Sequence, residues 1–111
     1  MTRIAMSPAA SALLRILIAR ARVERDRILL TDAQSTDWQS LTFNGERHHL
    51  ALRVTGLDSG EVVRRMCAGL EDAEFSIPGH FVADIAVLGT PQQAVDGSTS
   101  LTIEALTISA D

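Results

Sequence analysis

The sequence predicts a two-layer α+β domain of the order α-β-β-α-β-β, with an antiparallel four-stranded sheet and two helices packed on it. Three observations predict this fold. A chain of 111 residues suits one domain, residues 1–111, with a single hydrophobic core. Two helical patterns alternate with two pairs of strand-like segments. The connections within each pair are short, which favours antiparallel hairpins.

The first helix is expected over residues 8–25. Ser7 offers a hydroxyl acceptor at the N-cap, and Pro8 follows where a missing N–H costs nothing. On a helical wheel the apolar side chains sweep a wide arc and leave Ser11, Arg15 and Arg22 as the polar edge. This wide arc has two interpretations: deep burial of the helix, or contact of its excess apolar surface with a second subunit.

The first strand is expected at residues 28–30, a short apolar run, and a polar connection over residues 32–40 follows it. This connection contains the only tryptophan, Trp38. The indole has two interpretations. It is either a lid on the edge of the core or a contact residue at an interface, where tryptophan is enriched among hot spots.

A hairpin is expected next. Residues 41–43 form a short strand that leads into Asn44-Gly45, a dipeptide that favours a tight turn because both residues tolerate positive φ. The strand over residues 47–54 alternates between two faces. Its apolar face carries His48, Leu50, Leu52 and Val54.

The second helix is expected from Asp58 to about Glu71. Asp58 and Glu61 stand three positions apart, as in a capping box, and the apolar side chains that follow share one face. This helix covers one face of the sheet.

The last two strands are expected at about residues 80–88 and 101–108, joined by a loop over residues 89–100. Asp96-Gly97 marks the sharpest bend of this loop. The apolar residues of the last strand change parity along its length, which predicts a β-bulge near Ala105.

Charge is distributed unevenly along the chain. It carries 10 basic and 14 acidic residues, a net charge of −4, and every basic residue is arginine. Six arginines and two acidic residues lie within residues 1–27, whereas residues 28–111 hold four arginines and twelve acidic residues. The acidic balance argues against a specific nucleic-acid partner. The asymmetry favours attraction between the two ends or between neighbouring copies.

The single cysteine, Cys67, forms no intrachain disulfide, which favours a reducing compartment and a cytoplasmic location. The longest runs without a charged residue or histidine, residues 4–14 and 85–95, are shorter than the ~18 apolar residues of a membrane span. Arg15 interrupts the apolar N-terminal stretch, so we expect a helix of the fold there and not a signal peptide. No membrane partner is expected.

Familiar catalytic and cofactor motifs do not occur in the sequence. It has no G-x-S-x-G elbow, no G-x-G-x-x-G loop and no lysine for a P-loop. His48 and His49 are adjacent in a strand and point to opposite faces, so they do not readily share a metal ion. We expect no catalytic, cofactor or metal site, and we interpret His48 as a core or subunit-interface imidazole.

Several short pieces occur in a fixed order from residue 28 onward. They are Asp37-Trp38, Gly45-Glu46-Arg47-His48, Leu50-Ala51-Leu52-Arg53-Val54, Glu61-Val62-Val63-Arg64-Arg65, Pro78-Gly79-His80, Asp96-Gly97 and Ala105-Leu106-Thr107. In this order and at these intervals, the chain resembles the small tail-completion, or tail-terminator-like, proteins of tailed phages, prophages and gene transfer agents. It has Thr55-Gly56 where that family usually has a Trp-Ser pair.

The resemblance implies structural work without catalysis. A ring of copies, hexameric in related terminators, caps the growing tail tube, halts its polymerisation and offers a surface for head joining. The implied partners are further copies of the chain in a homo-oligomer, tail tube proteins and head-tail connector proteins. A ring needs heterologous contacts, and our hypothetical contact joins basic and acidic side chains of neighbouring subunits. They are Arg15 and Arg22 on one subunit and Glu71, Asp72 and Glu74 on the next.

Two other classes of function remain open. A small dimeric α+β module that binds or senses a ligand is the alternative, and a concave apolar pocket with converging polar groups is its signature. The third possible class of function is an enzyme that uses His48 or His80 together with Asp84. The loss of a measurable activity on mutating either histidine would favour it.

Overall fold

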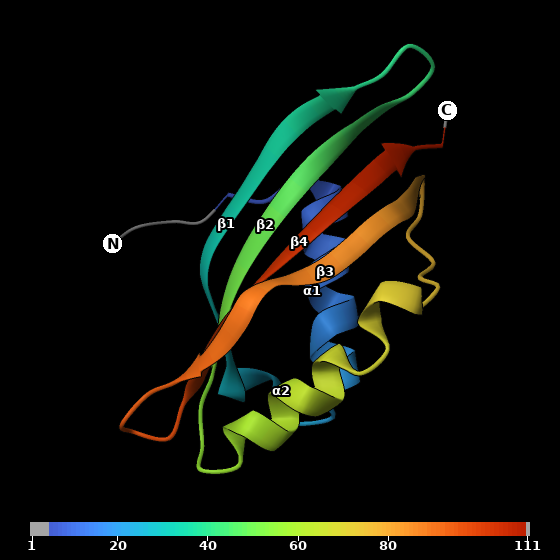
Figure 1. The fold of residues 1–111 in the computed structure, drawn as a ribbon. Coiled ribbons are helices and arrows are strands. Elements are labelled where there is room, and N and C mark those ends of the chain that lie inside the picture. Colours follow the sequence, from blue (N-terminus) through green and yellow to red (C-terminus); the bar gives the residue numbers. More distant parts are fainter. Residues whose placement is uncertain (1–4, 111) are drawn as a thin grey trace.

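A computed structural model describes residues 5–110; residues 1–4, which include Arg3, and residue 111 lie outside the described part. Within residues 5–110 the chain folds as two α-helices and a four-stranded antiparallel sheet, which confirms the predicted α+β class. The strands lie side by side in the order β1-β2-β4-β3 (Figure 1). The elements are α1 (Pro8–Ala21), β1 (Ile28–Gln39), β2 (Asn44–Val54), α2 (Ser59–Cys67), β3 (His80–Gln93) and β4 (Thr99–Ser109), with short 3-10 turns at Arg25–Arg27 and Leu70–Asp72.

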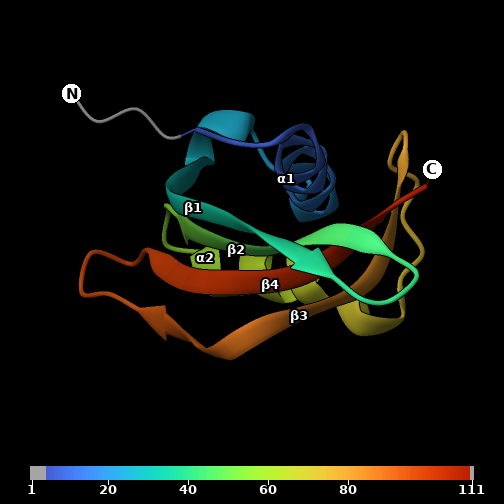
Figure 2. The same cartoon turned by 90° about the horizontal axis from the view of Figure 1, so that it is seen from above.

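Both helices pack on the same face of the sheet, called here the inner face. In Figure 1, α1 lies behind the strands and α2 runs beside their lower half; Figure 2 shows α1 against one side of the sheet. Each large apolar side chain that is fully buried contributes roughly 1.5–3 kcal/mol. The centre of the core is formed by Leu13 and Leu17 of α1, Val62 and Met66 of α2, Leu50 and Leu52 of β2, and Ile103 of β4.

The predicted start of α1 is confirmed. The Ser7 hydroxyl accepts a hydrogen bond from the Ala10 N–H at 3.2 Å, and Pro8 occupies the first turn. The helix ends at Ala21 and not at residue 25, because Arg22 adopts the left-handed conformation with φ of 56°. No helix among residues 5–110 is both long enough and apolar enough to cross a membrane.

The expected polar connection over residues 32–40 is wrong. β1 continues through Gln39 and pairs with β2 along its whole length, with one irregularity between Leu30 and Asp32. β1 lies at the edge of the sheet, where the helices bury few of its side chains. An edge strand of this kind keeps a polar sequence, which hydrophobic periodicity alone assigns to a loop.

The hairpin turn between β1 and β2 lies three or four residues earlier than predicted. The Ser40 N–H donates to the Phe43 carbonyl oxygen at 2.9 Å and so closes the turn. Asn44 and Gly45 instead begin β2. Gly45 is needed there for a different reason: a β-carbon would overlap the carbonyl oxygen of Thr107 on β4.

The β-bulge predicted near Ala105 is also wrong. β4 pairs with β2 without a register shift, and the irregularity lies in β3, between Val82 and Asp84. The parity of the apolar residues changes because Thr107 occupies the inner face, fully buried. The alternation of β4 therefore places Leu106 on the outer face.

The capping box predicted for α2 does not form. The Asp58 side chain makes no capping hydrogen bond and pairs with the Arg27 guanidinium. The helix ends at Cys67, short of residue 71, and Gly69 in the left-handed region leads into the 3-10 turn.

The strand β3 is longer than predicted. It continues to Gln93 and loses its regular pairing with β4 between Leu88 and Gln92. The turn to β4 is closed by a hydrogen bond from the Ala94 N–H to the Ser98 carbonyl oxygen at 2.8 Å. Its bend at Asp96-Gly97 follows the prediction, since Gly97 has φ of 89°.

Candidate functional site

His48 lies inside the core, bound by hydroxyl groups at both ring nitrogens. Its Nδ1 is 2.7 Å from the Ser35 Oγ on β1, and its Nε2 is 2.8 Å from the Thr107 Oγ1 on β4. The side chain is 0 % exposed, so of the two interpretations, a core imidazole or a subunit-interface imidazole, the burial supports the core one. Burial lowers the pKa of His48, against an opposing effect of Glu46. The imidazole links three strands in its neutral form.

Trp38 lies on the outer face of the sheet, away from the helices. Register places it opposite Gly45, and the same row continues through Ile108 to Phe81. The indole is half-buried. It therefore does not cover the edge of the core between sheet and helices, and a contact role stays a prediction.

The five charged residues predicted at an interface, Glu74 among them, are all exposed. Arg15 lies on α1, Arg22 follows its end, and Glu71 and Asp72 lie in the 3-10 turn after α2. No hydrogen bond or ion pair of the described residues joins the arginines to the acidic residues within one chain. The predicted contact between subunits therefore stays a prediction.

A groove of about 660 Å³ lies where the two helix ends meet. Arg20, Arg22 and Arg65 line it together with Glu74 and Phe75. Arg22 and Glu74 thus border the same groove of one chain, although the sequence-based hypothesis placed them on opposite sides of a subunit contact. Arg20 also holds its guanidinium over the Phe75 ring, 5.7 Å from the ring centre.

The side chains considered for an enzyme site, a histidine with Asp84, are not brought together. Strand alternation and register place His80 on the inner face and Asp84 on the outer face. The His80 Nδ1 lies 3.2 Å from the Pro78 carbonyl oxygen. Among residues 5–110, no group of three or more His, Cys, Asp or Glu side chains is arranged to hold a metal ion.

The outer face carries a charged cluster at its centre. The His49 Nε2 lies 2.6 Å from the Glu104 carboxylate, and the Arg47 guanidinium approaches the same carboxylate at 3.5 Å. The hydrogen bond from His49 lowers the pKa of Glu104. These side chains are partly exposed, so their contribution to the free energy of unfolding is small.

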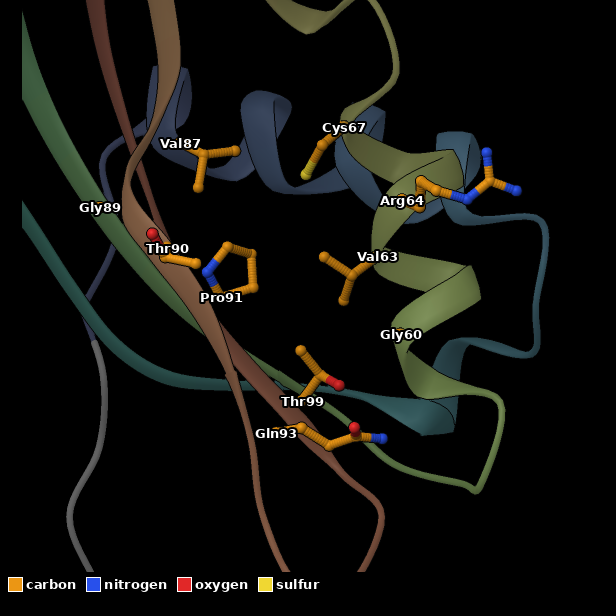
Figure 3. A pocket seen from close by; sticks show the side chains of 10 residues that line it. All are labelled: Gly60, Val63, Arg64, Cys67, Val87, Gly89, Thr90, Pro91, Gln93 and Thr99. Atoms are coloured by element: carbon orange, nitrogen blue, oxygen red, sulfur yellow. The ribbon is translucent and has the colours of Figure 1, made fainter.

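A second groove, the α2–β3 groove, has a volume of about 510 Å³ and separates α2 from the irregular part of β3 (Figure 3). It opens where β3 leaves its regular pairing and where Gly89 adopts φ of 73°. Figure 3 shows the side chains of Val63 and Cys67 pointing into it from α2, opposite Val87 and Pro91. Burial raises the pKa of the Cys67 thiol.

Two of the polar side chains that line this groove, Thr99 and Arg64, are engaged within the chain, and Thr90 and Gln93 line it as well. The Thr99 hydroxyl lies 2.7 Å from the Ser59 Oγ. The Arg64 guanidinium points away from the groove and bonds the Glu61 carboxylate at 3.0 Å (Figure 3). The lining is mainly apolar, with Thr90 and Gln93 as further polar side chains.

Both ends of the sheet expose large apolar side chains. At the end with the β1–β2 turn, called here the turn end, Leu41 is fully exposed and Phe43 is 55 % exposed. At the opposite end, the groove end, Leu57 is 90 % exposed and Val95 is fully exposed. The strands and α2 separate these two ends (Figure 1).

These surfaces were not predicted from the sequence. Leu41 and Phe43 alternate as strand residues do, and only the preceding Ser40, a turn-forming residue, signals the true turn. The sequence predicts a loop at Gly89 and Pro91. A glycine and a proline directly after an apolar strand segment indicate that the edge of the sheet is irregular there. Such an irregular edge leaves room for a groove.

No family model matches the chain, and no curated protein matches it either.

Proposed function

We propose that this chain is a structural subunit of a phage-like tail, of the tail-completion or terminator type. Its copies form a homo-oligomeric ring that caps the tail tube and offers a joining surface. The observation that carries this proposal is the exposure of large apolar side chains at both ends of the sheet. Apolar surface of this kind, set at defined places on a small domain, is characteristic of a contact with another protein.

The two exposed ends favour a particular kind of assembly. The molecule is 46 Å long, and Leu41 and Val95 lie at turns on opposite ends of its strands. A contact between the turn end of one copy and the groove end of another joins two different surfaces. Such heterologous contacts build closed rings when the rotation between copies closes, and filaments when it does not. A closed ring is also what the resemblance to tail-completion proteins implies, a resemblance that rests on the order of short sequence pieces from residue 28 onward.

The alternative, a small dimeric ligand-binding or regulatory module, is favoured by one observation. The α2–β3 groove, at about 510 Å³, has the size of many small-molecule sites. A specific ligand site also needs a few polar groups free to orient the ligand. At this groove Thr99 is bonded to Ser59 and Arg64 to Glu61, which leaves Thr90 and Gln93 as the lining polar side chains available to orient a ligand.

The direct test of the capping role uses the tube protein of the same particle, whose gene we expect close to the gene for this chain. The tube protein is polymerised with and without the full chain, and tube lengths are measured by electron microscopy. We expect shorter tubes with extra density at one end. Unchanged tube lengths at a molar excess of this chain would contradict the capping role.

A further inference from the structure

We propose that Ser35 is a nucleophilic site that takes up acyl groups from uncharged, activated carboxylic esters, with His48 as its general base. This inference goes beyond the proposed structural role and does not depend on it. It rests on two hydroxyl groups and one imidazole that β1, β2 and β4 bring together on the inner face of the sheet. They belong to Ser35, His48 and Thr107.

The Ser35 hydroxyl and the His48 imidazole are placed as a nucleophile and its base. The Ser35 Oγ lies 2.7 Å from the His48 Nδ1, within the distance over which a neutral imidazole accepts a hydroxyl proton. Ser35 is exposed, whereas His48 is fully buried. A reagent in solution therefore reaches the hydroxyl, and the base lies directly behind it.

Thr107 orients the imidazole from its other side. Its Oγ1 lies 2.8 Å from the His48 Nε2, and the residue is fully buried. In the tautomer with a proton on Nε2, this N–H donates to Thr107 and leaves Nδ1 to accept from Ser35. A hydroxyl stands where most triads have a carboxylate, so it stabilises the imidazolium less. We therefore expect a slow reaction, limited to esters with a good leaving group.

The backbone of Ser35 supplies a donor for the negative charge of the intermediate. The Ser40 N–H bonds the Phe43 carbonyl oxygen, which makes residues 40 and 43 a hydrogen-bonded pair of the antiparallel ladder. Pairs alternate from there without a register shift, so Ser35 and His48 form a non-hydrogen-bonded pair. The Ser35 N–H therefore points away from β2, toward the open edge of the sheet. One residue thus carries both the nucleophile and an oxyanion donor.

Acidic side chains beside the pair select the kind of ester. Asp37 follows Ser35 on the same face of β1 and stands opposite Glu46 of β2. The two carboxylates repel an anionic acyl donor, whereas an uncharged ester approaches without this repulsion.

The reaction balances with the groups present. The Ser35 Oγ attacks the carbonyl carbon of the ester, and its proton passes to the His48 Nδ1. The new bond between Oγ and carbon forms as the carbonyl double bond opens to an oxyanion. When the oxyanion collapses, the bond to the leaving oxygen breaks, and this oxygen takes the proton from Nδ1. The products are acylated Ser35, the free alcohol and neutral His48.

The test treats the full native chain with 4-nitrophenyl acetate at neutral pH. Release of 4-nitrophenolate gives the rate, and peptide mapping by mass spectrometry locates the acetyl group. Because the chain has no lysine, no lysine amine competes for it. Ser100 is the internal comparison, an exposed strand serine that no histidine of residues 5–110 bonds. We expect acetylation of Ser35 to be about 10²-fold faster than that of Ser100.

Matched variants separate the base from the architecture. Ser35→Ala is expected to remove the fast acetylation, and Ser100→Ala to leave it unchanged. His48→Gln keeps hydrogen-bonding capacity toward both hydroxyls but removes the base, so we expect a rate at Ser35 about 10²-fold lower. Circular dichroism shows which variants are folded.

The pH profile of the native chain is a readout that needs no variant. His48 acts as a base only when neutral, so the rate at Ser35 is expected to rise through its pKa and then level off. Burial lowers this pKa, Glu46 opposes the effect, and His80 of β3 adds to it. Acetylation of Ser35 no faster than that of Ser100 would overturn the proposal. So would a rate that keeps rising with hydroxide concentration without levelling, or one that a folded His48→Gln variant retains.

Discussion

Arg20 and Arg65 each hydrogen-bond to the C-terminal end of the other's helix. The Arg20 Nε donates to the Met66 carbonyl oxygen at 2.8 Å, and its Nη2 donates to the Ala68 carbonyl oxygen. The Arg65 Nε donates to the Ala21 carbonyl oxygen at 2.9 Å. Carbonyl groups at helix ends lack partners within the helix, and cations there also match the helix dipole. The two arginines thereby fix α1 and α2 against each other above the sheet.

Replacing Arg20 is expected to destabilise the fold. Arg20→Ala removes two hydrogen bonds from a charged donor and the contact with Phe75, and we expect a loss of about 2 kcal/mol in the free energy of unfolding. Urea denaturation followed by circular dichroism measures it. Arg15→Ala, at an exposed position on the same helix, is the matched control and is expected to change stability little. Equal stabilities of the two variants would contradict the capping role of Arg20.

The buried His48 predicts a loss of stability in mild acid. Its pKa is lowered in the folded protein, so the unfolded chain binds the proton more readily than the folded one. The free energy of unfolding is therefore highest above the ordinary histidine pKa of about 6.5 and falls as pH drops below it. Urea midpoints at pH 7.5 and 5.5 measure the effect.

His48→Gln separates this effect from other groups. Glutamine keeps hydrogen-bonding capacity toward Ser35 and Thr107 but does not titrate. The carboxyl groups with lowered pKa, such as Glu104, lose their contribution only at lower pH, below about 4.5. A stability difference between pH 7.5 and 5.5 that persists in the glutamine variant would show that His48 is not its source.

Two glycine-to-alanine substitutions are expected to act in opposite directions. A β-carbon at Gly45 overlaps the Thr107 carbonyl oxygen, so Gly45→Ala forces β2 and β4 apart at a cost of about 1–3 kcal/mol. Gly60 lies in α2 with open space at its β-carbon position, and Gly60→Ala is expected to stabilise by up to about 1 kcal/mol. Thermal unfolding of both variants beside the native chain tests the pair.

Charge reversal tests the predicted contact between basic and acidic surfaces of neighbouring copies. Arg15→Glu with Arg22→Glu is expected to weaken the oligomer, because Glu71 and Asp72 of the neighbour then meet negative charge. Arg25→Glu, another exposed arginine of the same segment, is the control. Light scattering at equal concentrations compares them. If the double variant assembles as the native chain does, this pairing is wrong.

The fold class was predictable because the local signals agreed with one another. Ser7 and Pro8 mark the start of α1, and the alternation of residues 47–54 marks a half-buried strand. The errors occur where a tertiary contact decides the local structure. Thr107 breaks the apolar pattern of β4 because its hydroxyl is needed at His48, and Asp58 leaves its capping role to pair with Arg27.

The candidate site was less predictable than the fold. Trp38, Arg15 and Arg22 stand out in the sequence by their residue type, but the groove depends on the distance between α2 and the irregular edge of β3, which are far apart in the chain. The exposure of Leu41 follows from a turn that a single serine closes. Sequence periodicity gives neither the distance between two elements nor the exposure of a side chain. It therefore predicts an interface but not the α2–β3 groove or the exposed Leu41.

The mass of the native chain in solution tests the central claim most directly. Light scattering behind size exclusion, at high protein concentration and at two salt concentrations, counts the copies. We predict one closed oligomer of more than two copies, near the six implied by the resemblance to tail terminators, and its conversion to smaller species by Leu41→Ser but not by Leu29→Ser. A monomer or a dimer at every concentration, unaffected by Leu41→Ser, would contradict ring assembly.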